Sequence, residues 1–157
     1  MKIYRLYRKQ LLATDIQSAW EFFTDPDNLS KITPGYIEFK ITKLSSKEMY
    51  PGMLLHYRIK PILKLPMKWI TEISQVYEPV WFLDEQRIGP YKMWRHQHIF
   101  REVGGGVQME DIVDYAMPFG LLGRIVHFLV VAKKLKSIFD FRRRVLDQIF
   151  NSGRRET

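Results

Sequence analysis

The sequence contains no cysteine among its 157 residues, which excludes disulfide bonds and thiolate metal sites. It also lacks an apolar run of the roughly 20 residues that a membrane-spanning helix needs, since the longest uncharged stretch near its end covers residues 125–132. The N-terminal stretch MKIYRLYRKQLL is charged throughout and has no apolar segment of the kind found in signal peptides. We therefore expect a cytoplasmic protein.

Acidic residues are scarce, so the formal net charge is +8. Residues 119–157 hold nine Lys and Arg against three Asp and Glu, which places +6 of that charge near the C-terminus. The favoured interpretation is a solvated helix face, made of Lys133, Lys134, Lys136, Arg142, Arg143 and Arg144. The alternative is weak contact with an anionic membrane surface. No specific nucleic-acid binding is predicted.

Motifs for nucleophilic catalysis and for phosphate binding are missing. None of the serines lies in a Gly-x-Ser-x-Gly elbow. Residues 104–106 are three glycines, but no Lys-Ser/Thr pair follows them, so they favour a hairpin tip over a phosphate loop. We expect no cofactor.

What the chain does contain is enough apolar material for a core, with 46% hydrophobic and 14% aromatic residues. We expect one domain over residues 1–150 and a disordered tail over residues 151–157. Within residues 119–150, apolar side chains recur at the three- and four-residue spacing of a single amphipathic helix. Such a helix would be about 40 Å long and needs a covering layer to bury its apolar stripe.

Most of the remaining chain alternates between apolar and polar residues, which is typical of β-strands. Thr14 and Asp15 are N-cap residues for a short helix whose apolar residues follow from Ile16, and a second short helical turn is expected over residues 27–32. The predicted strands cover residues 3–13, 37–42, 53–60, 67–77, 80–86, 94–100 and 109–115. The order predicts one curved sheet that holds one long helix.

Three motifs make the sequence similar to a known superfamily. They are Phe82-x-Asp84-x-Gln86-x-x-Gly89-Pro90-Tyr91, Trp94-x-His96-x-His98-x-Phe100 and Asp111-x-x-x-Tyr115-x-x-Pro118-x-Gly120. The chain resembles the START/Bet v 1-like superfamily, in particular its bacterial SRPBCC proteins of the polyketide cyclase/dehydrase-like kind. The resemblance implies an α+β helix-grip fold: a seven-stranded antiparallel sheet curled around the C-terminal helix, with two short helices between the first two strands. It also implies a cavity for an apolar or amphipathic molecule, but no shared catalytic residues.

Polar residues interrupt the apolar face of three predicted strands. If the turn near residue 90 is tight, Asp84 lies opposite His96, and if the glycine tip centres near residue 105, His98 lies opposite Asp111. We therefore predict two His–carboxylate pairs that line one pocket and that could act in acid–base catalysis or anchor a ligand. The alternatives are a buried structural network and a face turned to solvent. Two His and a carboxylate can also hold a metal, but we predict none.

The leading hypothesis is a non-catalytic binder of a small hydrophobic or amphipathic molecule. An enzyme of the cyclase, dehydratase or lyase type and a peripheral membrane module are the alternatives, and the oligomeric state stays open. The predicted ligand-binding residues are Tyr57, Trp69, Phe82, Asp84, Gln86, Trp94, His96, His98, Phe100, Asp111, Val113, Tyr115, Ile125, Phe128, Leu129 and Ala132, with Ile138 further along the helix.

Overall fold

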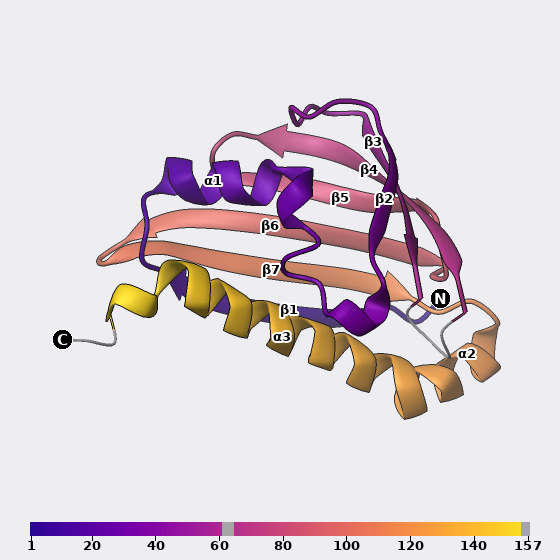
Figure 1. Cartoon of the computed structure of the whole chain (residues 1–157). Helices are drawn as coiled ribbons and strands as arrows, with labels where there is room; N and C mark the ends of the chain where they lie inside the picture. Colours follow the sequence, from indigo (N-terminus) through magenta and orange to yellow (C-terminus); the bar gives the residue numbers. More distant parts are fainter. Residues whose placement is uncertain (61–64, 155–157) are drawn as a thin grey trace.

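A computed structural model describes residues 1–60 and 65–154 of the chain (Figure 1). Its centre is one antiparallel sheet with the strand order β1-β7-β6-β5-β4-β3-β2, so the first and last strands in sequence pair with each other. The strands are β1 (Tyr4–Leu12), β2 (Lys40–Leu44), β3 (Met53–Ile59), β4 (Met67–Tyr77), β5 (Trp81–Ile88), β6 (Met93–Val103) and β7 (Gly106–Ala116). The predicted seven-stranded sheet is confirmed.

The segment between β1 and β2 covers one end of the sheet. Helix α1 (Ile16–Thr24) begins where the Asp15 carboxylate accepts a hydrogen bond from the backbone N–H of Ser18 at 2.8 Å. Its Trp20 ring packs edge-on against Phe82 and Phe100 of the sheet. Only short 3₁₀ turns, η1 (Pro26–Asn28) and η2 (Gly35–Ile37), follow α1.

The second predicted strand begins later than the sequence pattern indicates. Residues 37–42 alternate as a strand would, but Ile37 belongs to η2 and β2 starts only at Lys40. The cause is Glu38, whose φ of 49° is left-handed and interrupts the extended backbone. The prediction for residues 61–64, a loop or broken strand, lies outside the described residues.

The C-terminal helix is continuous but not uniform. Helix α2 (Gly120–Val126) continues through a π-helical turn, η3 (His127–Val131), into α3 (Ala132–Phe150). Helix α3 lies across the sheet (Figure 1). The residues that α3 and the end of η3 bury are Val131, Leu135, Phe139, Arg142 and Leu146. Among the described residues, no helix is both long enough and apolar enough to cross a membrane.

The predicted inward positions before α3 are wrong. Ile125, Phe128 and Leu129 are 50%, 78% and 59% exposed, and Ala132 is only partly buried. A π turn adds one residue to a helical turn, and each added residue rotates the following positions by about 100°. The stripe that faces the sheet after the turn therefore cannot be extended backwards with ordinary helical spacing.

The end of α3 is fixed to the first strand. The Asn151 side chain donates a hydrogen bond to the carbonyl oxygen of Leu11 and accepts one from the backbone N–H of Ala13, both at 2.9 Å. Asn151, which the sequence assigns to a disordered tail, is thus held by β1, and a short 3₁₀ turn (Ser152–Arg154) follows it. The rest of the predicted tail, residues 155–157, lies outside the described part of the chain.

Candidate functional site

A cavity of about 190 Å³ lies between the sheet, the α1–η2 segment and α3. Its walls are mainly aromatic and aliphatic, with a small cluster of polar side chains, Asp84, His96 and His98, on the central strands of the sheet. Eight of the predicted ligand-binding residues line it: Tyr57, Trp69, Phe82, Asp84, Trp94, His96, His98 and Ile138. Leu135, Ile138, Phe139 and Arg142 of α3 complete the wall on the helix side.

The other predicted residues have different positions. Phe100 is fully buried and packs on Phe23 and Phe82 in the core beside the cavity. Asp111 and Val113 are buried behind the histidines and do not line the cavity. Tyr115 is also buried, and its hydroxyl lies 2.8 Å from His127 Nε2.

Gln86 braces the turn between β5 and β6 instead of facing the cavity. Its side-chain amide donates to the carbonyl oxygen of Tyr91 at 2.7 Å and accepts from the Tyr91 backbone N–H at 3.3 Å. Gly89 permits this arrangement, because a Cβ atom there would collide with the Gln86 side chain. The turn in turn holds the Tyr91 ring against Trp69 and Trp94 in the cavity wall.

The strand register brings the two histidines and the two aspartates together. Asp84 is the partner of His96 across β5 and β6, and His98 is the partner of Asp111 across β6 and β7, as the turn positions predict. The shortest contacts, however, run diagonally. His96 Nε2 lies 2.7 Å from Asp111 Oδ1, and His98 Nε2 lies 3.1 Å from Asp84 Oδ2.

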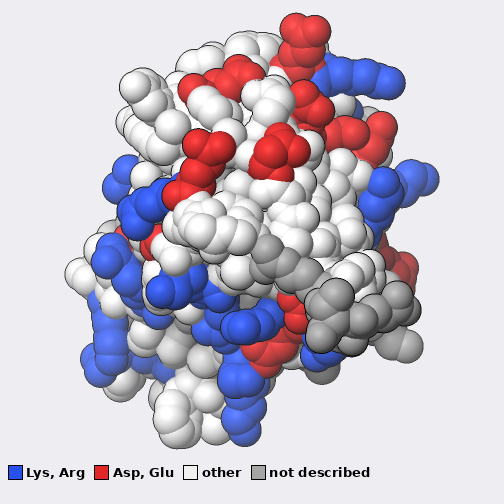
Figure 2. All heavy atoms as spheres, turned by 90° about the vertical axis from the view of Figure 1, so that its left-hand side faces the viewer, with Lys and Arg blue, Asp and Glu red and all other residues white. Residues whose placement is uncertain are grey.

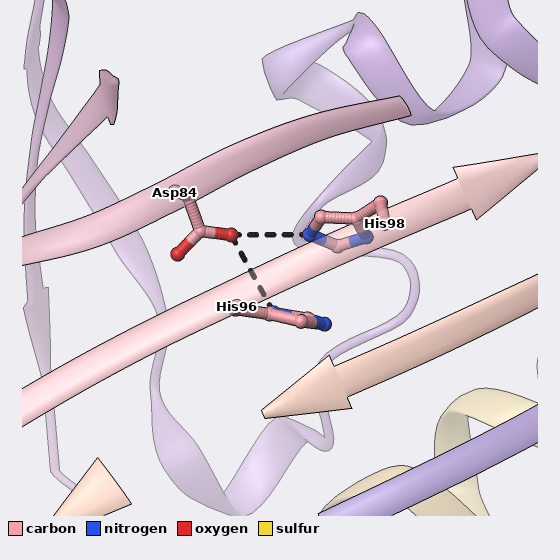
Figure 3. A group of neighbouring side chains, drawn as sticks. All are labelled: Asp84, His96 and His98. Atoms are coloured by element: carbon pink, nitrogen blue, oxygen red, sulfur yellow. Dashed lines mark hydrogen bonds and ion pairs between the residues drawn. The ribbon is translucent and has the colours of Figure 1, made fainter. Parts of the chain in front are cut away.

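Each imidazole also approaches the second carboxylate. His96 Nδ1 is 3.5 Å from Asp84 Oδ2, and His98 Nδ1 is 3.2 Å from Asp111 Oδ1, although this last contact does not have hydrogen-bond geometry. The two rings lie side by side, with centroids 3.8 Å apart, and Figure 3 shows one oxygen of Asp84 joined to a nitrogen of each ring. The predicted two pairs are therefore one four-residue network.

Arg142 joins this network from α3 and is the residue that the sequence interpretation missed. Its side chain is buried, its Nη1 lies 3.5 Å from Asp111 Oδ1, and its guanidinium lies over the Phe139 ring at 4.8 Å. The assignment of Arg142 to the solvated basic face is thus wrong. Its burial could have been inferred from helical spacing, because Arg142 follows Leu135 by seven residues and so falls on the apolar stripe.

The network shifts the pKa values of its members in different directions. Burial opposes ionisation of Asp111, but the charge of Arg142 and the hydrogen bond from His96 hold its pKa well below the ordinary value. Burial and the neighbouring His98 lower the pKa of His96. Burial also acts to lower the pKa of His98, but Asp111 and Asp84 outweigh it and raise that pKa above its ordinary value. His98 is therefore the histidine of the two that holds a proton more strongly, and His96, whose Nε2 faces Asp111, keeps its lone pair on Nδ1 when it is neutral.

Because the two pKa values move in opposite directions, the histidines should affect stability on opposite sides of pH 6.5. A raised pKa makes charged His98 stabilising below about pH 6.5, and this contribution is lost as the pH rises through the folded-state pKa. We expect His98→Gln to abolish the alkaline decline in the free energy of unfolding, measured by urea denaturation between about pH 5 and pH 9. His96→Gln should instead reduce the loss on the acidic side. An unchanged alkaline slope in His98→Gln would contradict this assignment.

Asp84, His96 and His98 also offer three ligand atoms within 4.8 Å of one another. Their residue types suit zinc or non-haem iron. In this structure the same atoms are engaged in hydrogen bonds and ion pairs within the network. The expectation that the protein carries no metal stays a prediction.

Three buried side-chain nitrogen atoms in the cavity wall have no hydrogen-bond partner within the described structure. One of them, His98 Nδ1, still lies 3.2 Å from the Asp111 carboxylate, which leaves Trp69 Nε1 and Arg142 Nε as the two donors to consider. Trp69 is 7% exposed and Arg142 is 8% exposed, so bulk water does not solvate either group freely. Buried donors are nearly always paired in proteins. Both groups are therefore candidates for contact with a bound molecule.

No model of a known protein family matches the sequence, and no curated protein matches it either. Solved structures do match. The protein TTHA0849 from Thermus thermophilus has a TM-score of 0.69 at 11% identity, over 94% of this chain and 95% of its own. A norcoclaurine synthase point mutant from Thalictrum, in complex with a transition-state analogue, has a TM-score of 0.67 at 13% identity, over 94% and 96%.

The protein Ara h 8.0201 matches with a TM-score of 0.59 at 14% identity, over 92% of this chain and 98% of its own. These likenesses extend over almost the whole length of each protein, and at 11–14% identity they concern the fold and not the roles of single residues. The chain therefore has the same helix-grip fold as these proteins, which is the fold that the resemblance of the three sequence motifs implies.

Proposed function

We propose that the protein binds a small amphipathic molecule in the cavity, with an apolar body of one or two aromatic rings and at least one acceptor oxygen. The observation that carries this proposal is the pair of unpaired donors, Trp69 Nε1 and Arg142 Nε, in an otherwise apolar wall. A buried donor without a partner costs about 1–3 kcal/mol. A ligand oxygen that accepted from either donor would recover part of that loss.

Size and wall chemistry support the same class of ligand. The cavity of about 190 Å³ exceeds the apolar cavity of about 150 Å³ that binds benzene, and it is smaller than the sites of about 300–1,000 Å³ that hold drug-sized molecules. Trp69 and Trp94 meet at right angles with centroids 5.4 Å apart, and so offer both a ring face and a ring edge. The norcoclaurine synthase neighbour also holds a small molecule.

The first experiment is native mass spectrometry of freshly purified protein, followed by organic extraction. A co-purified aromatic or amphipathic compound with an oxygen function is the expected result. If the protein is free of ligand, titration with naphthol, whose fluorescence reports binding, tests the cavity directly. Failure to bind naphthol or any extracted compound would overturn the proposal.

Trp69→Phe should weaken binding of naphthol or of the extracted compound by about tenfold, because it removes the Nε1 donor and keeps a ring in the wall. The matched control is Trp81→Phe, since Trp81 lies outside the cavity lining. The control should bind as the unmodified protein does. Equal affinities of the two variants would show that Trp69 Nε1 does not contact the ligand.

An enzyme with proton-transfer chemistry is the second candidate, favoured by the opposite pKa shifts of the two histidines. Neutral His96 has a lone pair on Nδ1, beside Asp84, for use as a general base, and His98, whose pKa is raised, lies next to it as a proton donor. A polyketide-like aromatic substrate is the class to test. Turnover that depends on pH and is lost in His96→Gln would distinguish this candidate from a binder.

A further inference from the structure

An unusually apolar surface lies at the start of the C-terminal helix, away from the ligand cavity. Large apolar side chains are exposed there in nearly every position, with Phe119 at 82%, Phe128 at 78% and Leu121 at 69%. We call this surface the apolar ridge, and its members are Phe119, Leu121, Leu122, Ile125, Val126, Phe128, Leu129 and Val130. Contiguous exposed apolar surface of this kind marks a binding surface for a partner or a membrane.

The ridge projects from the body of the molecule. It occupies α2 and the π-helical turn, at the lower right of Figure 1, beyond the ends of the central strands. Because the π turn changes the helical phase, the inward face here consists of small or polar residues, Gly123 and His127, and the large apolar residues point outward. The π-helical turn, which made the predicted inward positions of the helix wrong, therefore also explains why the apolar ridge is exposed.

The charged residues within the ridge segment of the chain are of one sign. Between Asp114 and Asp140 the chain has no acidic residue, while it has Arg124, Lys133, Lys134 and Lys136. The N-terminus adds to this end of the molecule, because the Tyr4 ring stacks on His127 with centroids 3.5 Å apart. Met1, 71% exposed, and Lys2 therefore lie near the ridge.

The opposite end of the molecule is different. Figure 2 shows that end with acidic side chains gathered mainly in its upper half and basic side chains mainly in its lower half. It therefore carries both signs of charge. On the C-terminal helix, by contrast, exposed apolar side chains with basic and no acidic residues among them occur in the segment that precedes Asp140.

We propose that the apolar ridge docks on the surface of an anionic lipid bilayer. Its apolar side chains would lie at the boundary between headgroups and acyl chains, and Arg124 and Lys133 would lie at the level of the lipid phosphates. Apolar residues combined with Lys and Arg, in a helical segment whose residues 120–139 include no acidic residue, are the composition of helices that lie in the membrane interface. The positive charge complements anionic lipid, and this argument favours a membrane over a second copy of the same basic surface.

This docking surface differs from the one expected from sequence, which was the basic face of the helix alone. It also places the ligand cavity close to the lipid, because Leu135 and Ile138, the next turns of the same helix, line that cavity. Docking does not depend on the cavity being occupied. Loss of vesicle binding and loss of ligand binding can therefore be observed separately.

The test is co-sedimentation of the full chain with vesicles of phosphatidylcholine, with or without about 30% phosphatidylglycerol. We expect binding to the anionic vesicles that weakens at least tenfold as salt rises from roughly 0.05 M to 0.5 M. Phe128→Asp should lower the vesicle partition coefficient at least tenfold, because it places a charge in the apolar interface. The matched control is Tyr77→Asp, which alters an aromatic residue that is 62% exposed on β4 and should bind as the unmodified protein does.

Leu121→Asp is a second variant within the ridge and should reproduce the loss, with circular dichroism confirming that each variant is folded. The proposal is overturned if the unmodified protein fails to bind anionic vesicles at low salt, or if Phe128→Asp and Tyr77→Asp behave alike. It is also overturned if light scattering shows a dimer that Phe128→Asp dissociates while no vesicle binds. That result would assign the ridge to a second copy of the chain.

Discussion

Replacing Asp111 with Asn should lower the free energy of unfolding by about 3–5 kcal/mol, measured by urea denaturation near neutral pH. Asp111 is 5% exposed, and its Oδ1 atom lies 2.7 Å from His96 Nε2, 3.2 Å from His98 Nδ1 and 3.5 Å from Arg142 Nη1. An amide keeps the shape but removes the charge. The cations of Arg142 and His98 would then remain buried beside a neutral group, and their desolvation would no longer be compensated.

The matched control is Asp114→Asn, on the same strand but on the other face of the sheet. Asp114 pairs with Arg5, whose side chain is 66% exposed, so we expect little change in the urea midpoint. The lowered pKa of Asp111 also fixes the pH dependence: its contribution is present above the ordinary pKa of 3.8 and is lost as the pH falls through the folded-state value. The difference between Asp111→Asn and the unmodified protein should therefore shrink in acid. Similar effects of both substitutions would show that the network is not the stabilising element.

The sheet could be predicted from sequence because its determinants are local. Alternation along each strand identifies the buried face, and Pro and Gly mark the turns. The position of a tight turn then sets the register of its hairpin. This is why the alignment of Asp84 with His96, and of His98 with Asp111, followed from counting residues outward from the turns.

The connection of those side chains into one network could not be predicted from register. Partner positions describe Cα atoms, whereas an imidazole extends far enough to reach both neighbouring strands. His96 consequently makes its shorter contact with Asp111, although its strand partner on the other side is Asp84. Side-chain reach, and not strand pairing, decides which groups meet.

The prediction of which residues of the C-terminal helix face inward failed for a different reason. Apolar spacing located it correctly, but spacing alone cannot show a π turn, because the wider hydrogen-bond pattern at His127–Val131 has no sequence signature. As a result Phe128 and Leu129 were assigned to the cavity and lie at the surface. Arg142 was assigned to the surface by charge and is buried, because it pairs with a carboxylate from another element, Asp111.

The cavity wall and the hydrophobic core behind it are different sets of residues, and two phenylalanines, one in each set, allow this difference to be tested. Phe82 and Phe100 both pack edge-on against Trp20, with centroids at 5.7 and 5.9 Å. Phe82 lines the cavity and stacks on His98 at 4.2 Å, whereas Phe100 is 0% exposed and does not line the cavity. The sequence interpretation places both in the ligand-binding wall.

Phe100→Ala should lower the free energy of unfolding by about 3–5 kcal/mol, because it leaves a void among Trp20, Phe23 and Phe82. The affinity of the folded protein for naphthol should change little. Phe82→Ala should also be destabilising, but it removes part of the wall and should change that affinity by about fivefold or more. Urea denaturation and fluorescence titration at a temperature where both variants are folded give the two quantities. If Phe100→Ala altered the affinity as much as Phe82→Ala, the ligand would reach deeper than the cavity does, and the wider wall predicted from sequence would be correct.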